Sequence, residues 1–419
     1  MRIWYRNLDH GTLLLWGILT TAGLVAIYSS THGAAQEFLL DSVRQNFYRQ
    51  LLWCGMCVVV IVIALFQPVR FYLSLAMPAY VVSLILLIAA LLFGREVGGA
   101  QSWISIGPIG FQSSELAKVG TLLAVAHFFS ARTQSPGRIP AALQAVGLIV
   151  VPAILIVLQN DVGTALVYLG LIPVMLLWGG MQLSNVLLIL SPAVAGYLAI
   201  VYLPAAIVFA VVLMGGLFWA TGDYRRVVLA TVLTGGTIGT ALFALSTVLE
   251  PHQVARVISF TNPEAEEFRS GVGFHLVQSK AAIGSGGLFG SGFMEGTQTQ
   301  GRLIPEQSTD FIFSVIGEEW GFVGAVAILV FFSVFLIRLV RIASQVRHPF
   351  ASMIAAGAAG MYLIHLVINV GMVMGLLPVI GIPLPFLSYG GSALLSNTAM
   401  LAIALSLHMR RDDFSIFRY

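Results

Sequence analysis

Twelve apolar segments, separated by short polar stretches, dominate this 419-residue sequence. A helix needs about 20 apolar residues to cross a bilayer, and each segment approaches or exceeds that length. They predict an all-α fold, a polytopic membrane helical bundle of about 12 transmembrane helices. The segments are 12–29, 51–67, 71–93, 113–131, 140–158, 162–178, 183–202, 204–221, 227–248, 321–338, 351–375 and 389–408.

The composition agrees with a membrane protein and excludes several other classes. Apolar residues make up 58% of the chain and charged residues only 9%, whereas about 25% of a typical soluble protein is charged. A soluble enzyme, a disordered chain and a nucleic-acid binder are excluded, because each needs more charge than this. A β-barrel is excluded because its strands are short and alternate in polarity.

The positions of the basic residues predict the orientation of the helices. Cytoplasmic loops of membrane proteins are enriched in Lys and Arg. With the N-terminus inside and the spans alternating, 13 of the 21 basic residues fall on the inner side. We therefore expect a multi-pass protein with both termini in the cytoplasm. The chain 1–419 then forms a single membrane domain, in which 249–310 is a large extracytoplasmic loop.

Ionisable residues at the edges of these segments are candidates for chemistry, because a charge near lipid is costly. Asp310 stands where the outer loop meets the next span, and partial desolvation there would raise its pKa and suit it to act as a general base. An alternative role for Asp310 is that of a helix N-cap, since the run of Ser308, Thr309 and Asp310 directly precedes an apolar helix. Asp161 is likewise explained as the N-cap of the segment that follows it.

Three further features have alternative interpretations. Glu115 and Lys118 are spaced i,i+3, which suits either a structural ion pair or the lining of a polar site. The glycine-rich stretch 284–292 lacks the ending of a phosphate loop, so we predict a turn and not a nucleotide site. Two prolines interrupt 381–391, and such backbone is tolerated at membrane depth only against protein or water. We expect this segment to dip into a cavity on the side of Asp310.

Four motifs, taken together, resemble the SEDS family (shape, elongation, division and sporulation proteins). They lie at 111–118, 279–288, 305–311 and 381–391, and the last is closer to the RodA-like branch of the family. The resemblance implies a peptidoglycan glycosyltransferase that polymerises lipid II into glycan strands during cell elongation and shape maintenance. It implies the outer face of the bacterial cytoplasmic membrane as its place, and a class B penicillin-binding protein (a transpeptidase) as its partner.

The resemblance also assigns residues and predicts an insertion. The essential aspartate of the family matches Asp310, and its paired Glu and Lys match Glu115 and Lys118. Such proteins usually have ten spans. The stretch 183–248 contains three candidate helices where one is usual, so we expect an inserted helix pair there in addition to the core of ten.

Lipid II polymerisation needs a base for the acceptor hydroxyl and charge stabilisation for the departing diphosphate. We predict Asp310 as the catalytic base. The basic residues predicted on the outer side of the membrane are candidate ligands of the diphosphate, because they are exceptions to the enrichment of basic residues on the inner side. A divalent cation, Mg or Mn, is an alternative, with Asp310 as its ligand. The predicted substrate-binding residues are Arg49, Glu115, Lys118, Arg256, Lys280, Arg302, Glu306, Ser388 and Tyr389.

Two other function classes suit a polytopic bundle with broken helices. A flippase or transporter for lipid-linked sugars needs ionisable groups near the bilayer midplane and access from both sides. A scaffold for a partner synthase needs no reactive group at all. The reactive candidates here gather at the outer side, which favours the glycosyltransferase.

Overall fold

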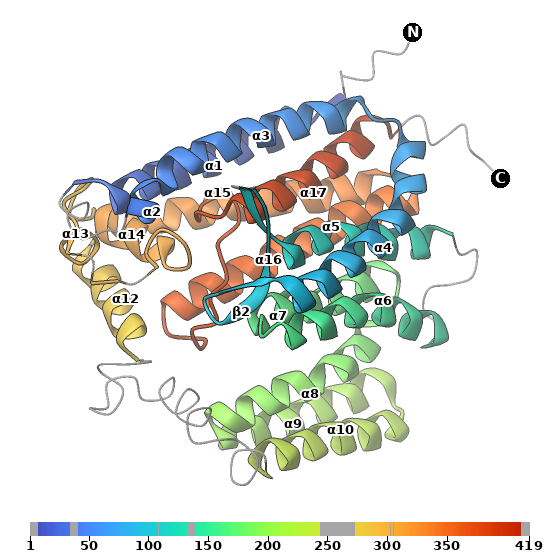
Figure 1. Ribbon diagram of the computed structural model, residues 1–419. Helices are drawn as coiled ribbons and strands as arrows, with labels where there is room; N and C mark the ends of the chain where they lie inside the picture. Colours follow the sequence, from blue (N-terminus) through green and yellow to red (C-terminus); the bar gives the residue numbers. More distant parts are fainter. Residues whose placement is uncertain are drawn as a thin grey trace. The chain divides into compact units, whose positions relative to one another are not determined.

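The computed structural model describes residues 7–33, 41–107, 109–131, 139–243, 273–301, 303–304 and 306–411. The chain is mostly helical (Figure 1). It divides into two compact units, which we describe separately. The first contains Met1–Ser135, Ile139–Met175 and Gln278–Tyr419, and the second contains Pro136–Arg138 and Leu176–Val277.

Each predicted span corresponds to a helix. Among the described residues, ten of these helices are long and apolar enough to cross a membrane. The predicted count of twelve is not confirmed, because α7 has only 17 residues and α5 is not among the ten. The helices are α1 (His10–Thr31), α3 (Asn46–Phe66), α4 (Val69–Phe93), α5 (Ser113–Ser130), α6 (Ile139–Leu158), α7 (Val162–Trp178), α8 (Leu183–Val201), α9 (Leu203–Thr221), α10 (Tyr224–Phe243), α15 (Gly321–Gln345), α16 (Pro349–Val373) and α17 (Gly391–Met409).

Helices α16 and α17 form the centre of the first unit and are buried along most of their length. Helix α5 packs against both of them, α15 packs against α16, and α3 packs against α17. The outer helices of this unit bury one face and expose apolar side chains on the other, as expected for a bundle in lipid. Buried Ser, Glu and Lys side chains lower the hydropathy of α5 and suit it to a position inside protein.

A small antiparallel sheet precedes α5, and the sequence analysis did not predict it. It consists of β1 (Arg95–Val97), β2 (Ala100–Ile106) and β3 (Ile109–Gln112), in that order. Trp103 lies opposite Gln112, so the sheet holds the beginning of α5 in a defined register. The backbone N–H of Gln101 also donates to the carbonyl of Gln159 at 2.9 Å, which ties β2 to the end of α6.

The glycine-rich stretch joins α12 (Phe274–Ser285) to the junction of α14 (Ile312–Glu319) and α15. The carbonyls of Gly287 and Leu288 accept from the first backbone N–H groups of α15, at 2.9 and 3.0 Å. The N–H groups of Ser291 and Gly292 donate to the last carbonyls of α14, at 2.9 and 3.1 Å. The predicted turn is therefore a backbone bridge that satisfies both helix ends.

Residues 374–390, between α16 and α17, form no regular helix or strand. Proline at 378, 383 and 385 removes backbone donors, and Gly375 and Gly381 have positive φ. The stretch from Leu384 to Ser388 is buried. The aromatic ring of Phe386 packs edge-on against Phe335 and Tyr362, with centroids 5.4 and 5.2 Å away. The segment is therefore irregular backbone packed against protein, and the predicted cavity on the side of Asp310 stays a prediction.

The second unit contains three adjacent helices, α8, α9 and α10, which all contact one another (Figure 1). Its core includes Leu188, Leu213, Leu217 and Ala230. Helix α8 ends at Val201 and α9 begins at Leu203, so the predicted division into the segments 183–202 and 204–221 is confirmed. The insertion of a helix pair within 183–248 stays a prediction, and so does the single domain 1–419. Much of the predicted loop 249–310, including residues 249–272, lies outside the described residues.

The backbone bridge predicts a sharp difference between two glycines. Gly290 has φ +84°, and a Cβ there would overlap the carbonyl of Glu319. Gly284 is helical, and a Cβ there would contact nothing within 4 Å. We expect Gly290→Ala to destabilise the protein by about 1–3 kcal/mol, because the left-handed conformation strains a side chain. Gly284→Ala should be neutral or stabilising. Thermal unfolding in detergent measures both, and equal stability of the two variants would contradict this role of the bridge.

Candidate active site

Asp310 lies in the short segment that leads into α14. Helix α14 begins at Ile312, its N-cap residue is Phe311, and no side chain caps it. The capping explanation of Asp310 is therefore wrong, because the helix begins one residue too late for this carboxylate to cap it. The backbone carbonyl of Asp310 instead accepts from the side-chain amide of Asn369 on α16, at 2.8 Å.

The Asp310 side chain is half-buried in an environment that disfavours its charge. Desolvation is the main effect, and the nearby carboxylates of Glu306 and Asp161 add like-charge repulsion; together they raise the pKa of Asp310 to about 7. A Cβ at Gly381 would stand 3.2 Å from Oδ2 of Asp310, so the backbone at the tip of the 374–390 segment packs directly against this carboxyl.

Asp161 caps α7 and also belongs to the surroundings of Asp310. Its Oδ1 accepts from the backbone N–H of Thr164 at 3.1 Å, which confirms the predicted N-cap. Its Oδ2 accepts from Gln112 at 2.8 Å and from Ser114 at 3.2 Å. Its proximity to Asp310 was not predicted from the sequence, because the two residues are 149 positions apart and no motif connects them.

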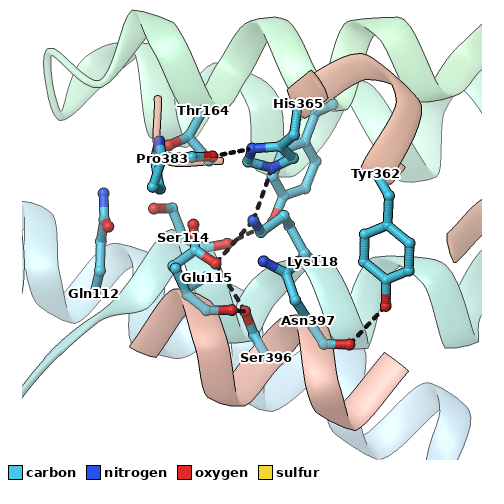
Figure 2. Close-up of polar contacts among 12 residues, drawn as sticks. Gln112, Ser114, Glu115, Lys118, Thr164, Tyr362, His365, Pro383, Ser396 and Asn397 are labelled. Atoms are coloured by element: carbon cyan, nitrogen blue, oxygen red, sulfur yellow. Dashed lines mark hydrogen bonds and ion pairs between the residues drawn. The ribbon is translucent and has the colours of Figure 1, made fainter. Parts of the chain in front are cut away.

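Glu115 and Lys118 form the ion pair that their spacing predicted. The Nζ of Lys118 lies 2.8 Å from Oε2 of Glu115, and both side chains are fully buried. The same oxygen accepts from Ser396 on α17 at 2.7 Å, as Figure 2 shows. The pair therefore joins α5 to α17 in the centre of the bundle.

His365 on α16 extends this network and was missed from the sequence. Its Nε2 lies 3.1 Å from Nζ of Lys118, and its Nδ1 lies 3.2 Å from the carbonyl oxygen of Pro383 (Figure 2). A carbonyl only accepts, so Nδ1 carries the proton and Nε2 accepts from Lys118. The only signal in the sequence was a polar residue inside a long apolar helix, which does not reveal its partner.

The 374–390 segment is attached to the Asp310 segment and to two helices. The N–H of Tyr389 donates to the carbonyl of Ser308 at 2.8 Å, and Asn369 donates to the carbonyl of Ile382 at 2.7 Å. On the opposite side, Gln50 of α3 donates to the carbonyl of Ser388 at 3.2 Å. The Ser388 hydroxyl accepts from Leu384 within the same segment, and its side chain is buried.

Apart from Glu115 and Lys118, which form the buried ion pair, the predicted substrate-binding residues fall into three groups. Glu306, Ser388 and Tyr389 belong to the two segments that surround Asp310. Arg49 is exposed on α3, where it donates to Gln45 at 3.0 Å, and Lys280 is exposed on α12. No contact joins either cation to Asp310. Arg256 and Arg302 lie outside the described residues.

A bound metal ion was the alternative for charge stabilisation. Across the part of the chain that the structure describes, no group of three or more His, Cys, Asp or Glu side chains is arranged to hold one. These residues do not make up a metal site by themselves. The divalent cation, Mg or Mn, stays a prediction.

Comparison with known proteins identifies a family model and several relatives that are similar to this chain. The family model of FtsW, RodA and SpoVE, described as "Cell cycle protein", matches residues 9–209 and 202–413. The peptidoglycan glycosyltransferase RodA of Treponema pallidum is 35% identical over 97% of this chain and 98% of its own. The peptidoglycan glycosyltransferase MrdB of Escherichia coli K12 is 34% identical over 88% and 86% of the two chains.

Solved structures agree with this similarity. A chain from a peptidoglycan synthase complex that coordinates polymerization and crosslinking superposes with a TM-score of 0.69 and 28% identity, over 96% of this chain and 98% of that one. The Rod shape determining protein RodA of Thermus thermophilus superposes with a TM-score of 0.63 and 27% identity, over 96% and 97%.

Removing one partner of the buried ion pair should lower the free energy of unfolding far more than removing one partner of an exposed pair. We expect Lys118→Met to lower the free energy of unfolding by about 3–5 kcal/mol, because Glu115 is left as a buried charge without a cation. The control is Asp223→Asn, which breaks the partly exposed pair with Arg226 at 3.7 Å and should cost less than about 1 kcal/mol. Unfolding in detergent separates the two, and equal losses would contradict the account.

Proposed function

This chain belongs to the FtsW, RodA and SpoVE family, and we propose that it polymerises lipid II with Asp310 as the general base. Both curated relatives described above are peptidoglycan glycosyltransferases that match most of this chain, so this chain is a peptidoglycan glycosyltransferase. The single observation that carries the assignment to Asp310 is its half-buried carboxyl beside Gly381, near the carboxylates of Glu306 and Asp161.

In the proposed reaction, the 4-hydroxyl oxygen of the acceptor sugar attacks C1 of the donor sugar. A bond forms between that oxygen and C1, and the bond between C1 and the diphosphate oxygen breaks. The hydroxyl proton passes to the Asp310 carboxylate, and the lipid diphosphate leaves with the bonding electron pair. A base whose pKa lies near the working pH is well suited to this transfer, because it is ionised yet still binds a proton strongly.

We propose Lys280 and Arg49 as ligands of the leaving diphosphate. The residue next to Lys280, Ser279, has its hydroxyl 2.7 Å from that of Ser314 on α14, so α12 lies against the helix that follows Asp310. The residue next to Arg49, Gln50, binds the 374–390 segment. Exposed cations that follow or precede residues bonded to α14 and to the 374–390 segment suit an anion that gains charge as its bond to C1 breaks. Arg256 and Arg302 remain predicted ligands of the same kind.

The cellular setting completes the proposal. The chain is a multi-pass membrane protein. We propose the bacterial cytoplasmic membrane, both termini in the cytoplasm and the site on the outer face, as the bias of basic residues predicts. A class B penicillin-binding protein as partner is supported by the similar chain that belongs to a peptidoglycan synthase complex. The curated relatives favour this function over the lipid-linked sugar flippase.

Replacing the proposed base without changing its size tests the function. We expect Asp310→Asn to fold as well as the wild type, because it removes a carboxylate that desolvation and two like charges destabilise. It should lose at least about 100-fold in the rate of lipid II polymerisation, since an amide cannot take the proton. The measurement is glycan synthesis from labelled lipid II by purified protein, with and without a class B penicillin-binding protein.

The matched control for this experiment is Glu96→Gln on β1, which neutralises an exposed carboxylate outside the Asp310 segment and the 374–390 segment. This variant should polymerise lipid II at the wild-type rate. Full glycan synthesis by Asp310→Asn would remove the base assignment. Failure of the wild type with and without the partner would remove the proposed substrate.

The raised pKa of Asp310 predicts an acid limb in the rate profile. The base acts only when ionised, so the rate should fall as the pH decreases through about 7, whereas an ordinary aspartate would stay ionised throughout this range. Neutralising a like charge makes ionisation easier, so Glu306→Gln should move the midpoint to lower pH. Initial rates between pH 5.5 and 9 measure both, and a flat wild-type profile would contradict the assignment.

A further inference from the structure

One buried amide connects the two segments that surround the Asp310 carboxyl. Asn369 lies on α16 and is completely buried. Its Nδ2 donates to the carbonyl of Asp310 at 2.8 Å and to the carbonyl of Ile382 at 2.7 Å. Both hydrogens of the amide are used, and reversing it would place an oxygen against two carbonyl oxygens. The orientation of this side chain is therefore fixed by its partners.

The positions that Asn369 connects are adjacent to the reactive group. Asp310 is bound through its own backbone, and Ile382 follows Gly381, whose backbone packs against Oδ2 of Asp310. A shift of residues 381–382 relative to Asp310 would change both the space and the solvation around the carboxyl. The other link between the segments, from Tyr389 to Ser308, is a backbone bond two residues before Asp310.

We propose that Asn369 is a positioning residue for Asp310. Its amide holds the Asp310 backbone and the 381–382 backbone in one arrangement, and this sets where the carboxyl stands relative to the acceptor hydroxyl. This inference rests on the proposed function, because it concerns the same base.

A role in packing alone does not explain an asparagine here. Among the described residues, Oδ1 of Asn369 is buried and has no hydrogen-bond partner. A buried acceptor without a partner lowers stability, so an apolar side chain of similar size would pack at less cost. The double donation to Asp310 and Ile382 is what an apolar residue cannot supply.

The test compares Asn369 with a residue that anchors the same segment at its other end. Gln50 donates to Ser388 and accepts from the N–H of Gly390 at 3.2 Å, without touching Asp310. We would measure kcat, KM, the pH profile and thermal unfolding for Asn369→Ala, Asn369→Ser and Gln50→Ala, with Asp310→Asn as the reference for a lost base. The substrate is labelled lipid II and the protein is the full chain.

We expect Asn369→Ala to lower kcat by about 10- to 100-fold at unchanged KM, since misplacing a reacting group by about 1 Å has effects of this size. Loosening the segment admits water to the carboxyl and lowers its pKa, so the acid limb should move to lower pH. Asn369→Ser keeps one donor and should recover part of the lost kcat. Gln50→Ala should lower thermal stability but leave the midpoint of the acid limb in place.

Two results would overturn the inference. In the first, Asn369→Ala matches Gln50→Ala, with lower stability but with kcat and the midpoint of the acid limb unchanged. Asn369 would then be a structural anchor only, and the proposed function would stand. In the second, Asp310→Asn retains full polymerisation. That result removes the base assignment and with it this inference, whatever the Asn369 variants do, whereas the polymerisation of lipid II itself would stand.

Discussion

Non-helical backbone inside a membrane bundle must find partners for its polar groups within the protein, and the site is built around that requirement. Residues 374–390 are such backbone. Side chains from α3 and α16 supply the partners, because Gln50 binds the Ser388 carbonyl while His365 and Asn369 bind those of Pro383 and Ile382. Without these donors, the carbonyls would be buried and unpaired, and the segment could not pack against Asp310.

Helix α16 connects the buried ion pair to the site. His365 and Asn369 are spaced i,i+4, so they share one face of the helix. His365 contacts Lys118 and the Pro383 carbonyl, and one turn later Asn369 contacts Ile382 and Asp310. The Glu115–Lys118 pair is therefore linked to the Asp310 backbone through the hydrogen bonds of His365 and Asn369 and the adjacent residues Ile382 and Pro383, although no hydrogen bond joins either charge to that carboxyl.

The sequence predicted the positions of the helices well, but it predicted poorly which side chains contact one another. Apolar length alone located helices such as α1 and α16, because a bilayer sets that length. The sheet β1–β3 was missed, since a few alternating residues between two long apolar segments give little signal. Asp310 was ambiguous between a cap and a base, because only the backbone of Phe311 shows where α14 begins. Asn369 was missed because spacing along a helix says nothing about which carbonyls face it from residues 310 and 382.

The same surroundings that suit Asp310 to catalysis also lower the stability of the folded protein. An acid whose pKa is raised in the folded protein lowers the stability of the fold as the pH rises from the ordinary pKa of the group to the raised one, because the unfolded chain loses the proton more easily. The carboxylates of Glu306 and Asp161 add to this loss of stability, yet hydrogen bonds hold each of them in place. Glu306 accepts from Thr309. Asp161 accepts from Gln112, Ser114 and Thr164. The buried helices α16 and α17 supply the packing that offsets this loss. A base that titrates near neutral pH is thus available only where the surrounding bundle is stable enough to hold three carboxylates near one another.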